Sequence, residues 1–175
     1  MKKIKLPLTI DAFLIDQKRL DYDGIYTAEQ VVRLTEAVVR VDSDVQIFLS
    51  FNIDNQRLKV ISGSAEVAVM LMCQRCWKPF KNQIRTTFCF NPGFNNDKRV
   101  EVFPEGNELI DVDKFGRVNL LAMVEDEIIL ALPIAPVHDS EHCKTSEADI
   151  VFGKLPDEVE KSNPFSILSS LRMSD

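Results

Sequence analysis

The sequence contains little of what defines several large classes of protein. Among its 175 residues there are only four cysteines, six glycines and eight prolines. Four cysteines are too few for a small disulfide-stapled scaffold, and so little glycine and proline excludes a collagen-like or low-complexity chain. The longest uncharged apolar run, 128–137, has about half the length of a membrane-spanning helix. What remains is a globular protein, and we expect its cysteines to be thiols in a reducing compartment.

Signals for export and for catalysis are also missing. The first residues, MKKIKLPLTIDAF, contain no long apolar run and do not resemble a signal peptide, so we expect a cytoplasmic protein without membrane contact. There is no glycine-rich phosphate loop, and His142 and Cys143 are neighbours without a third group to complete a catalytic set. The acidic residues 125–127 are expected on a solvated helix face. We therefore expect no catalytic residue, no enzymatic activity and no small-molecule substrate.

The net charge is negative, but one stretch of the chain is basic. There are 27 acidic and 21 basic residues, which gives a net charge of −6. Residues 67–96 contain four basic residues and no acidic one, so the rest of the chain carries −10. The acidic part suits basic protein partners, whereas the basic stretch can contact RNA. A solvated face with chance clustering is the alternative explanation.

Alternating hydrophobic residues predict three consecutive antiparallel strands. In the first, 45–53, every second residue is apolar, which is the pattern of a half-buried strand. Asp54-Asn55-Gln56 is the expected turn, and return strands follow at 58–73 and at about 80–90, which together make a meander. The other expected segments are an edge strand at 2–10, a polar connection at 16–24 and a further strand at 108–112.

Helical periodicity predicts one main helix. Asn119 can cap a helix over about 119–132, which has an apolar stripe and ends at Pro133. Thr27-Ala-Glu-Gln30 is a capping box that predicts a short helix over about 28–34. The predicted fold class is therefore α+β: an antiparallel β-meander or partly closed barrel with one main packed helix and short flanking helices.

Composition also predicts the domain organisation. Residues 1–153 are expected to form a single α+β domain, in which the turn-rich segment 91–107 is a mobile loop. Residues 154–175 are expected to form a polar linker and a short C-terminal helix that starts at Asn163-Pro164. That helix would carry an apolar stripe able to dock into the groove of a partner: Phe165, Leu168 and Leu171.

Cys73-Gln-Arg-Cys76 is the strongest local motif, and it lies in the expected turn between the second and third strands. Two thiolates at this spacing can hold one Zn²⁺, and a tetrahedral site needs two more ligands. Cys143, with either His138 or His142, can supply them. Free thiols are one alternative. A redox pair is another, but such pairs sit at a helix N-terminus, and here a strand follows.

Basic and aromatic residues are interleaved around this motif. Basic side chains can hold phosphates while an aromatic ring stacks on a base, so the stretch is a candidate for direct RNA contact. The alternative is that Trp77 only covers the edge of the sheet. The candidate contact residues are Arg75, Trp77, Lys78, Lys81 and Arg85.

Seven segments together resemble the YceD family, the large ribosomal RNA subunit accumulation proteins. They span most of the chain, and the run that begins at residue 120 is the most specific. The segments are QKRLDYDGIY (17–26), VDSDV (41–45), IDNQRL (53–58), CQRCWKPF (73–80), LLAMVEDEIILALPIAPVHDSEHC (120–143), EADIVFGKLP (147–156) and NPFSIL (163–168).

The resemblance implies a cytoplasmic, non-enzymatic factor needed for the synthesis, processing or stability of 23S rRNA. Relatives often carry the pair that corresponds to Cys73 and Cys76, and some carry a cysteine in place of His138. That exchange preserves ligand chemistry and favours His138 over His142 as the fourth ligand. Other relatives lack parts of the ligand set. The expected ligand set for structural zinc, the one candidate cofactor, is Cys73, Cys76, His138 and Cys143.

Two functions from different classes follow from these observations. In the first, the protein protects precursor large-subunit rRNA, or a ribosomal particle, through contacts of the basic stretch 75–85. Its acidic surfaces would then meet a basic ribosomal protein or a processing factor. In the second, it is a protein-binding adaptor that acts on such a protein without touching RNA. A third function, RNA processing by the chain itself, would require acidic residues such as Asp111 and Glu125 to converge.

Overall fold

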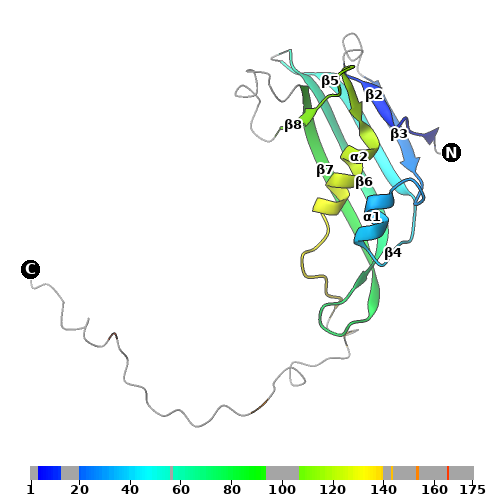
Figure 1. Ribbon diagram of the computed structural model, residues 1–175, viewed down its shortest axis with the longest axis vertical. Coiled ribbons are helices and arrows are strands. Elements are labelled where there is room, and N and C mark those ends of the chain that lie inside the picture. Colours follow the sequence, from blue (N-terminus) through cyan, green and yellow to red (C-terminus); the bar gives the residue numbers. More distant parts are fainter. Residues whose placement is uncertain are drawn as a thin grey trace, which may run out of the picture.

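One long antiparallel meander forms the centre of the fold. The computed structural model describes residues 4–12, 20–55, 57–93 and 107–139, together with the single residues 143, 153 and 165. Strands β5 (Val45–Ile53), β6 (Lys59–Met72) and β7 (Pro79–Gly93) run side by side, as the alternating sequence predicts (Figure 1). The long β6–β7 pair reaches beyond the rest of the sheet and ends in the turn that contains the two spaced cysteines.

Four further strands enlarge the sheet and leave it open. β3 (Leu20–Tyr26) and β4 (Arg40–Val41) pair antiparallel with β5 and β6, whereas β1 (Ile4–Lys5) and β8 (Glu108–Asp111) pair parallel with β3 and β7. The hydrogen-bonded order of the described strands is β1-β3-β5-β6-β7-β8, and its ends do not pair with each other. Of the two predicted forms, the structure therefore has the meander in an open sheet and not the partly closed barrel. β2 (Thr9–Asp11) and β9 (Arg117–Asn119) form a separate two-stranded sheet.

Three predicted segments differ from the structure. The polar connection predicted at 16–24 is wrong from Leu20 onward, because β3 pairs with β5 over its whole length. The edge strand predicted at 2–10 is divided into β1 and β2, with Pro7 between them. Of the loop predicted at 91–107, the first three residues belong to β7 instead, and residues 94–106 lie outside the described residues.

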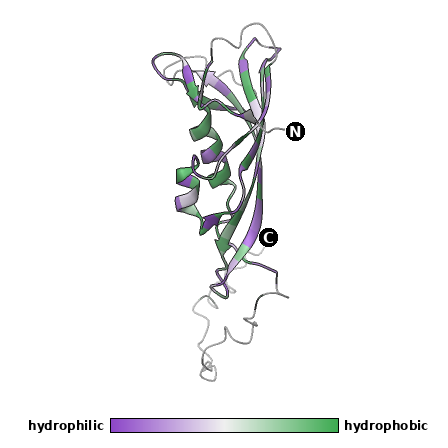
Figure 2. Ribbon diagram, turned by 90° about the vertical axis from the view of Figure 1, so that its right-hand side faces the viewer, coloured by the Kyte–Doolittle hydropathy of each residue, from purple (hydrophilic) through white to green (hydrophobic). Residues whose placement is uncertain are grey.

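Both helices lie on one face of the sheet (Figure 2). α2 (Leu120–Leu130) begins at Asn119, whose Oδ1 accepts a hydrogen bond of 3.1 Å from the Ala122 N–H, and α2 packs against β6 and β7. α1 (Val32–Ala37) lies beside α2. The core between helices and sheet is apolar, and its largest fully buried side chains are Tyr26, Val31, Leu34, Val45, Ile47, Leu49, Phe51, Ile61, Val67, Leu120 and Ile128.

The capping box predicted at Thr27 forms only in part, because the Gln30 side chain reaches back to the Thr27 N–H but the Thr27 hydroxyl does not accept the Gln30 N–H, and the pair closes a turn before the helix. The Thr27 N–H donates to Gln30 Oε1 over 3.0 Å, and the Gln30 N–H donates to the Thr27 carbonyl oxygen over 2.9 Å. Tyr26 and Val31, the flanking apolar residues, are both fully buried. α1 therefore begins at Val32, later than the helix predicted over 28–34.

Glu125 is not on a solvated face, which corrects the expectation for the acidic triplet. The residue is only 5% exposed, and its Oε1 accepts hydrogen bonds from the backbone N–H groups of Arg33, at 3.0 Å, and Leu34, at 3.4 Å. The neighbouring Asp126 forms an ion pair of 2.5 Å with the Arg33 side chain. α1 has no capping side chain of its own, so Glu125 of α2 takes that role and joins the two helices.

The described part of the chain contains no helix that is long and apolar enough to span a membrane. Of the linker and terminal helix predicted at 154–175, the structure describes only Phe165. The division of the chain at 153/154 therefore stays a prediction.

Candidate metal centre

The turn between β6 and β7 is folded tightly around a cysteine sulfur. The Cys73 N–H donates to the Lys78 carbonyl oxygen over 3.0 Å, and the Trp77 N–H donates to the Cys73 carbonyl oxygen over 2.9 Å. The Arg75 N–H points at Cys73 Sγ, with a donor–acceptor distance of 3.4 Å. Backbone donors aimed at a sulfur stabilise a thiolate, which is the form that binds a metal.

A second segment, 133–139, runs from the end of α2 down to this turn (Figure 1). It is fixed there by a hydrogen bond of 2.9 Å from the Gln74 N–H to the Pro136 carbonyl oxygen. His138 then lies against the turn, with its ring centroid 5.4 Å from that of Phe80. The Cys143 N–H donates to the Asp139 carbonyl oxygen over 3.1 Å, which keeps Cys143 beside the segment. We call residues 73–78 and 133–139, together with Cys143, the tip.

The tip brings the four predicted ligands together. The nearest ring nitrogen of His138 lies 3.8 Å from Cys76 Sγ, and the ligand atoms of Cys73, Cys76, His138 and Cys143 all lie within 4.8 Å of one another. Bond lengths in a tetrahedral zinc site of this type place the ligand atoms about 3.5–3.8 Å apart. The observed spacing is therefore close to that of a metal site. The alternative ligand His142 lies outside the described residues.

The thiols in this cluster do not all ionise with equal ease. Burial opposes a charge on Cys73, but the backbone N–H groups of His138, Cys76 and Arg75 donate toward its sulfur and bring its pKa to about 6. Burial raises the pKa of Cys76, and the adjacent Cys73 and Cys143 thiols contribute to the same direction. One thiolate is favoured while the next is opposed. A bound cation relieves that opposition because its positive charge offsets most of the negative charge of the thiolates.

The donor set determines what the cluster can do. Three cysteines and one histidine fill a tetrahedral shell and leave no position for water or substrate, which is typical of structural rather than catalytic zinc. Cys73 and Cys76 also lie in a turn between strands and not at a helix N-terminus, where redox-active pairs gain their low pKa. The arrangement can therefore fasten the segment 133–139 to the β6–β7 turn.

The predicted RNA-contact residues fall into two groups. Arg75, Trp77 and Lys78 are exposed on the turn, and Lys81 is exposed at the start of β7. Arg85 lies further along β7, where its guanidinium forms an ion pair of 2.9 Å with Glu66. Arg85, together with Gln83, holds the pKa of the Glu66 carboxyl below its usual range. The structure thus places Arg85 apart from the tip.

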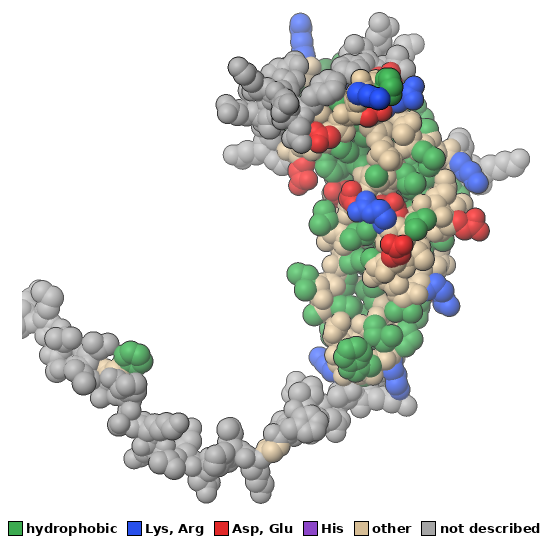
Figure 3. Space-filling model, viewed as in Figure 1, with side chains coloured by type: hydrophobic (Ala, Val, Ile, Leu, Met, Phe, Trp, Pro, Cys, Tyr) green, Lys and Arg blue, Asp and Glu red, His purple; other side chains and the backbone are tan. Residues whose placement is uncertain are grey.

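Exposed apolar side chains accompany the cations at the tip. Trp77 is 72% exposed, and Ile134 and Val137 of the second segment are exposed as well. Figure 3 shows hydrophobic side chains at this end of the molecule, with Lys or Arg on either side. The exposed apolar side chains of 133–137 were not among the predicted contact residues, because their position beside the turn depends on long-range contacts at Pro136 and His138.

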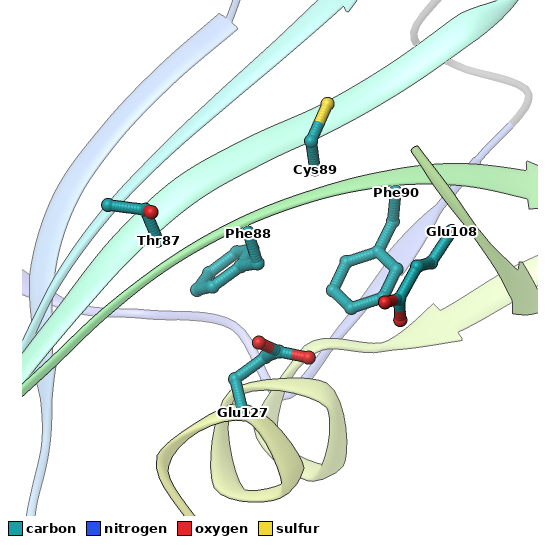
Figure 4. A pocket seen from close by; sticks show the side chains of 6 residues that line it. All are labelled: Thr87, Phe88, Cys89, Phe90, Glu108 and Glu127. Atoms are coloured by element: carbon teal, nitrogen blue, oxygen red, sulfur yellow. The ribbon is translucent and has the colours of Figure 1, made fainter. Parts of the chain in front are cut away.

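A hollow of about 390 Å³ lies between β7, β8 and α2 (Figure 4). Glu127 and Glu108 point into it beside Phe88 and Phe90, whereas Cys89 points away from these rings. Burial raises the pKa of Glu127, and the charges of Glu108 and Asp126 raise it further. An acidic hollow repels phosphates, so it does not extend the basic surface of the tip.

The predicted docking stripe is largely outside the described residues. Phe165 is 68% exposed, and Leu168 and Leu171 are not described. Partner docking by this stripe stays a prediction.

Comparisons with known proteins identify the family. The family model described as "Large ribosomal RNA subunit accumulation protein YceD" matches residues 61–172, which include all four candidate ligands. A protein of Haemophilus influenzae with the same description is 47% identical over 173 residues, which cover 98% of this chain and 99% of the relative. No solved structure matches the chain. Because the family model covers more than half of the chain and the relative nearly all of it, this protein belongs to the YceD family.

Proposed function

We propose that this protein acts as a cytoplasmic, non-enzymatic factor in the accumulation of large-subunit ribosomal RNA, and that it does so by binding RNA directly through the tip. The family description supports the biological process. The observation that carries the direct contact is a set of three exposed cations: Arg75 and Lys78 on the turn, which its own hydrogen bonds fix, and Lys81 at the start of β7 next to it. Within the described residues none of the three has an ion-pair partner.

We further propose that Cys73, Cys76, His138 and Cys143 hold one structural zinc ion. Such an ion supplies a cross-link between two segments that are about 60 residues apart in the sequence. The side chains of the tip, and not the ion, would then bind the RNA. The turn holds the backbone of Arg75 and Lys78 in place, and the hydrogen bond between Gln74 and Pro136 keeps 133–137 beside them. A fixed backbone lowers the entropic cost of ordering these side chains on a phosphate chain.

The expected dependence on salt follows from the number of cations. Three contacts to phosphates of a single strand give a slope of about −2 in log K against log salt. Binding should therefore weaken about 20-fold between 50 and 200 mM salt. The remainder of the chain is acidic and adds little to this affinity.

The test is sedimentation of the tagged protein in a cell extract at low and at high salt. We expect comigration with large-subunit precursors at low salt and its loss at high salt. Reversal of Arg75, Lys78 and Lys81 to Glu should abolish comigration. A matched control reverses three exposed cations away from the tip and changes the net charge equally: Lys5, Arg57 and Lys114.

Two results would contradict direct binding. If the wild-type protein stays at the top of the gradient at both salt concentrations, it does not bind the particle. If the tip variant comigrates as well as the control variant, the contact is made elsewhere, and an adaptor that binds a ribosomal protein or a processing factor becomes the better account.

A further inference from the structure

Trp77 occupies a backbone conformation that does not suit it. Its φ is 56°, in the left-handed region that is a genuine outlier for a bulky residue. The hydrogen bond from its N–H to the Cys73 carbonyl oxygen fixes this conformation, since the turn closes through it. A left-handed conformation is unfavourable for a residue with a side chain, whereas glycine adopts it freely. The turn by itself therefore favours glycine at position 77.

The Trp77 side chain gains little from packing in return. The residue is 72% exposed, so most of the indole is in contact with solvent. Trp77 also takes no part in the apolar core, because it is absent from the cluster of buried side chains and from the partly buried residues packed against it. A costly backbone conformation combined with an exposed aromatic ring indicates a residue retained for a contact outside the chain.

The surroundings of Trp77 indicate the chemistry of that contact. Arg75 and Lys78 flank it on the same turn, and residues 67–96 contain no acidic side chain. Ile134 and Val137 are exposed on the segment that Pro136 fastens to the turn. The turn therefore carries an aromatic ring between two cations, and the segment fastened to it carries exposed apolar side chains. Figure 3 shows hydrophobic side chains with Lys or Arg on either side at this end of the molecule.

We propose that Trp77 is a stacking platform for an unpaired base of single-stranded RNA, with Arg75 and Lys78 binding the phosphates on either side of that base. This inference rests on the proposed function, that the tip binds RNA, and names the kind of RNA. In a duplex both faces of each base are covered by neighbouring bases, so only an unpaired base offers a free face to the indole. Every base has such a face, so we expect weak sequence preference.

The chain offers a direct reporter, because Trp77 is its only tryptophan. The wild-type protein, prepared with zinc and a reducing agent, is titrated with oligouridylate, whose bases stack little on one another, and with an RNA duplex of the same length. Stacking on the base quenches the fluorescence of Trp77. We expect strong quenching by the single strand and little quenching by the duplex.

Two variants separate stacking from folding, and the fluorescence anisotropy of labelled oligouridylate measures their affinities. Trp77→Gly removes the ring and suits the left-handed backbone, so it should weaken binding about 10- to 100-fold while its denaturation midpoint stays equal or rises. Trp77→Phe keeps an aromatic ring and the strained backbone, so its affinity for the RNA should fall only a few-fold.

The outcomes that overturn the inference differ from those that overturn the proposed function. Equal affinity of Trp77→Gly and wild type, or equal quenching by single strand and duplex, refutes stacking and leaves RNA binding at the tip intact. A strong loss of stability in Trp77→Gly refutes it too, because Trp77 would then be a structural residue. Absence of binding to either RNA by the wild-type protein removes the proposed function itself, and an acidic protein segment becomes the better ligand for this surface.

Discussion

Replacement of Glu125 tests whether one buried carboxylate of α2 caps α1. The first-turn donors of α1, the N–H groups of Arg33 and Leu34, have no capping side chain from Val31, the residue before the helix. They donate instead to Glu125 Oε1 over 3.0 and 3.4 Å. Glu125→Ala removes this acceptor and leaves both donors in a space that water does not readily fill, since Glu125 is only 5% exposed.

The size of the effect follows from these two bonds. A hydrogen bond to a charged group contributes about 1.5–3 kcal/mol, and an orphaned buried donor costs a similar amount. The longer bond contributes less, so we expect Glu125→Ala to lower the free energy of unfolding by about 3 kcal/mol in total. Glu125→Gln keeps an oxygen acceptor and loses the charge at the helix N-terminus, which should cost about 1 kcal/mol.

Urea denaturation of the zinc-loaded protein measures these changes, with the m value as a check that the unfolded state is unchanged. Asp126→Ala is the matched control. Its ion pair with Arg33 joins side chains that are about half exposed and screened by solvent, so its loss should cost clearly less than the loss of Glu125. Capping of α1 by Glu125 is refuted if Glu125→Ala is no more destabilising than Asp126→Ala, or if Glu125→Gln is as destabilising as Glu125→Ala.

Two further predictions concern the sheet and the acidic hollow. A Cβ at Gly63 would meet the Phe48 carbonyl oxygen and lie 2.9 Å from side-chain carbons of Leu49 and Phe88, so Gly63→Ala should destabilise by about 2–3 kcal/mol in urea denaturation. A Cβ at Gly93 would meet only a side-chain carbon, at 3.0 Å, so Gly93→Ala should lower the free energy of unfolding clearly less. Equal destabilisation by the two variants would contradict the packing argument. Glu127 has a raised pKa in the folded state, so its protonation stabilises the protein at low pH, and this contribution is lost as pH rises through the raised value. Glu127→Gln should therefore be more stable than wild type by a few tenths of a kcal/mol at pH 7 and equal to it below the ordinary carboxyl pKa, as thermal denaturation across pH would measure. A difference independent of pH would contradict this.

The central strands were predictable because their periodicity reflects one buried and one open face. β5 has the predicted bounds, and β6 and β7 end within three residues of the predicted ends. β3 was not predictable from its own composition, since Leu20–Tyr26 contains two aspartates and a glycine. Its strand conformation depends on pairing with β5, where the Ser50 hydroxyl donates to the Asp21 carboxylate over 2.6 Å. The open shape of the sheet also depends on nonlocal pairs, at β1 and β8.

The candidate site was predictable to the extent that it is local. Cys73 and Cys76 lie in one turn, and the sequence placed that turn between two strands. The approach of His138 and Cys143 depends on the path of 133–139, which Pro133 and the bond at Pro136 direct to the tip. The roles of Glu125 and of the left-handed Trp77 were not visible, because one depends on a distant helix and the other on a backbone angle.

Metal content of the purified protein tests the central claim, that four residues from two segments form one metal centre at the tip. Protein prepared under reducing conditions with zinc present, then dialysed, should contain one zinc per chain by elemental analysis. Cys143→Ser should lose most of that zinc, whereas Cys89→Ser, which changes a cysteine outside the cluster, should keep it. Wild-type protein without zinc, or Cys143→Ser with as much zinc as wild type, would contradict the account.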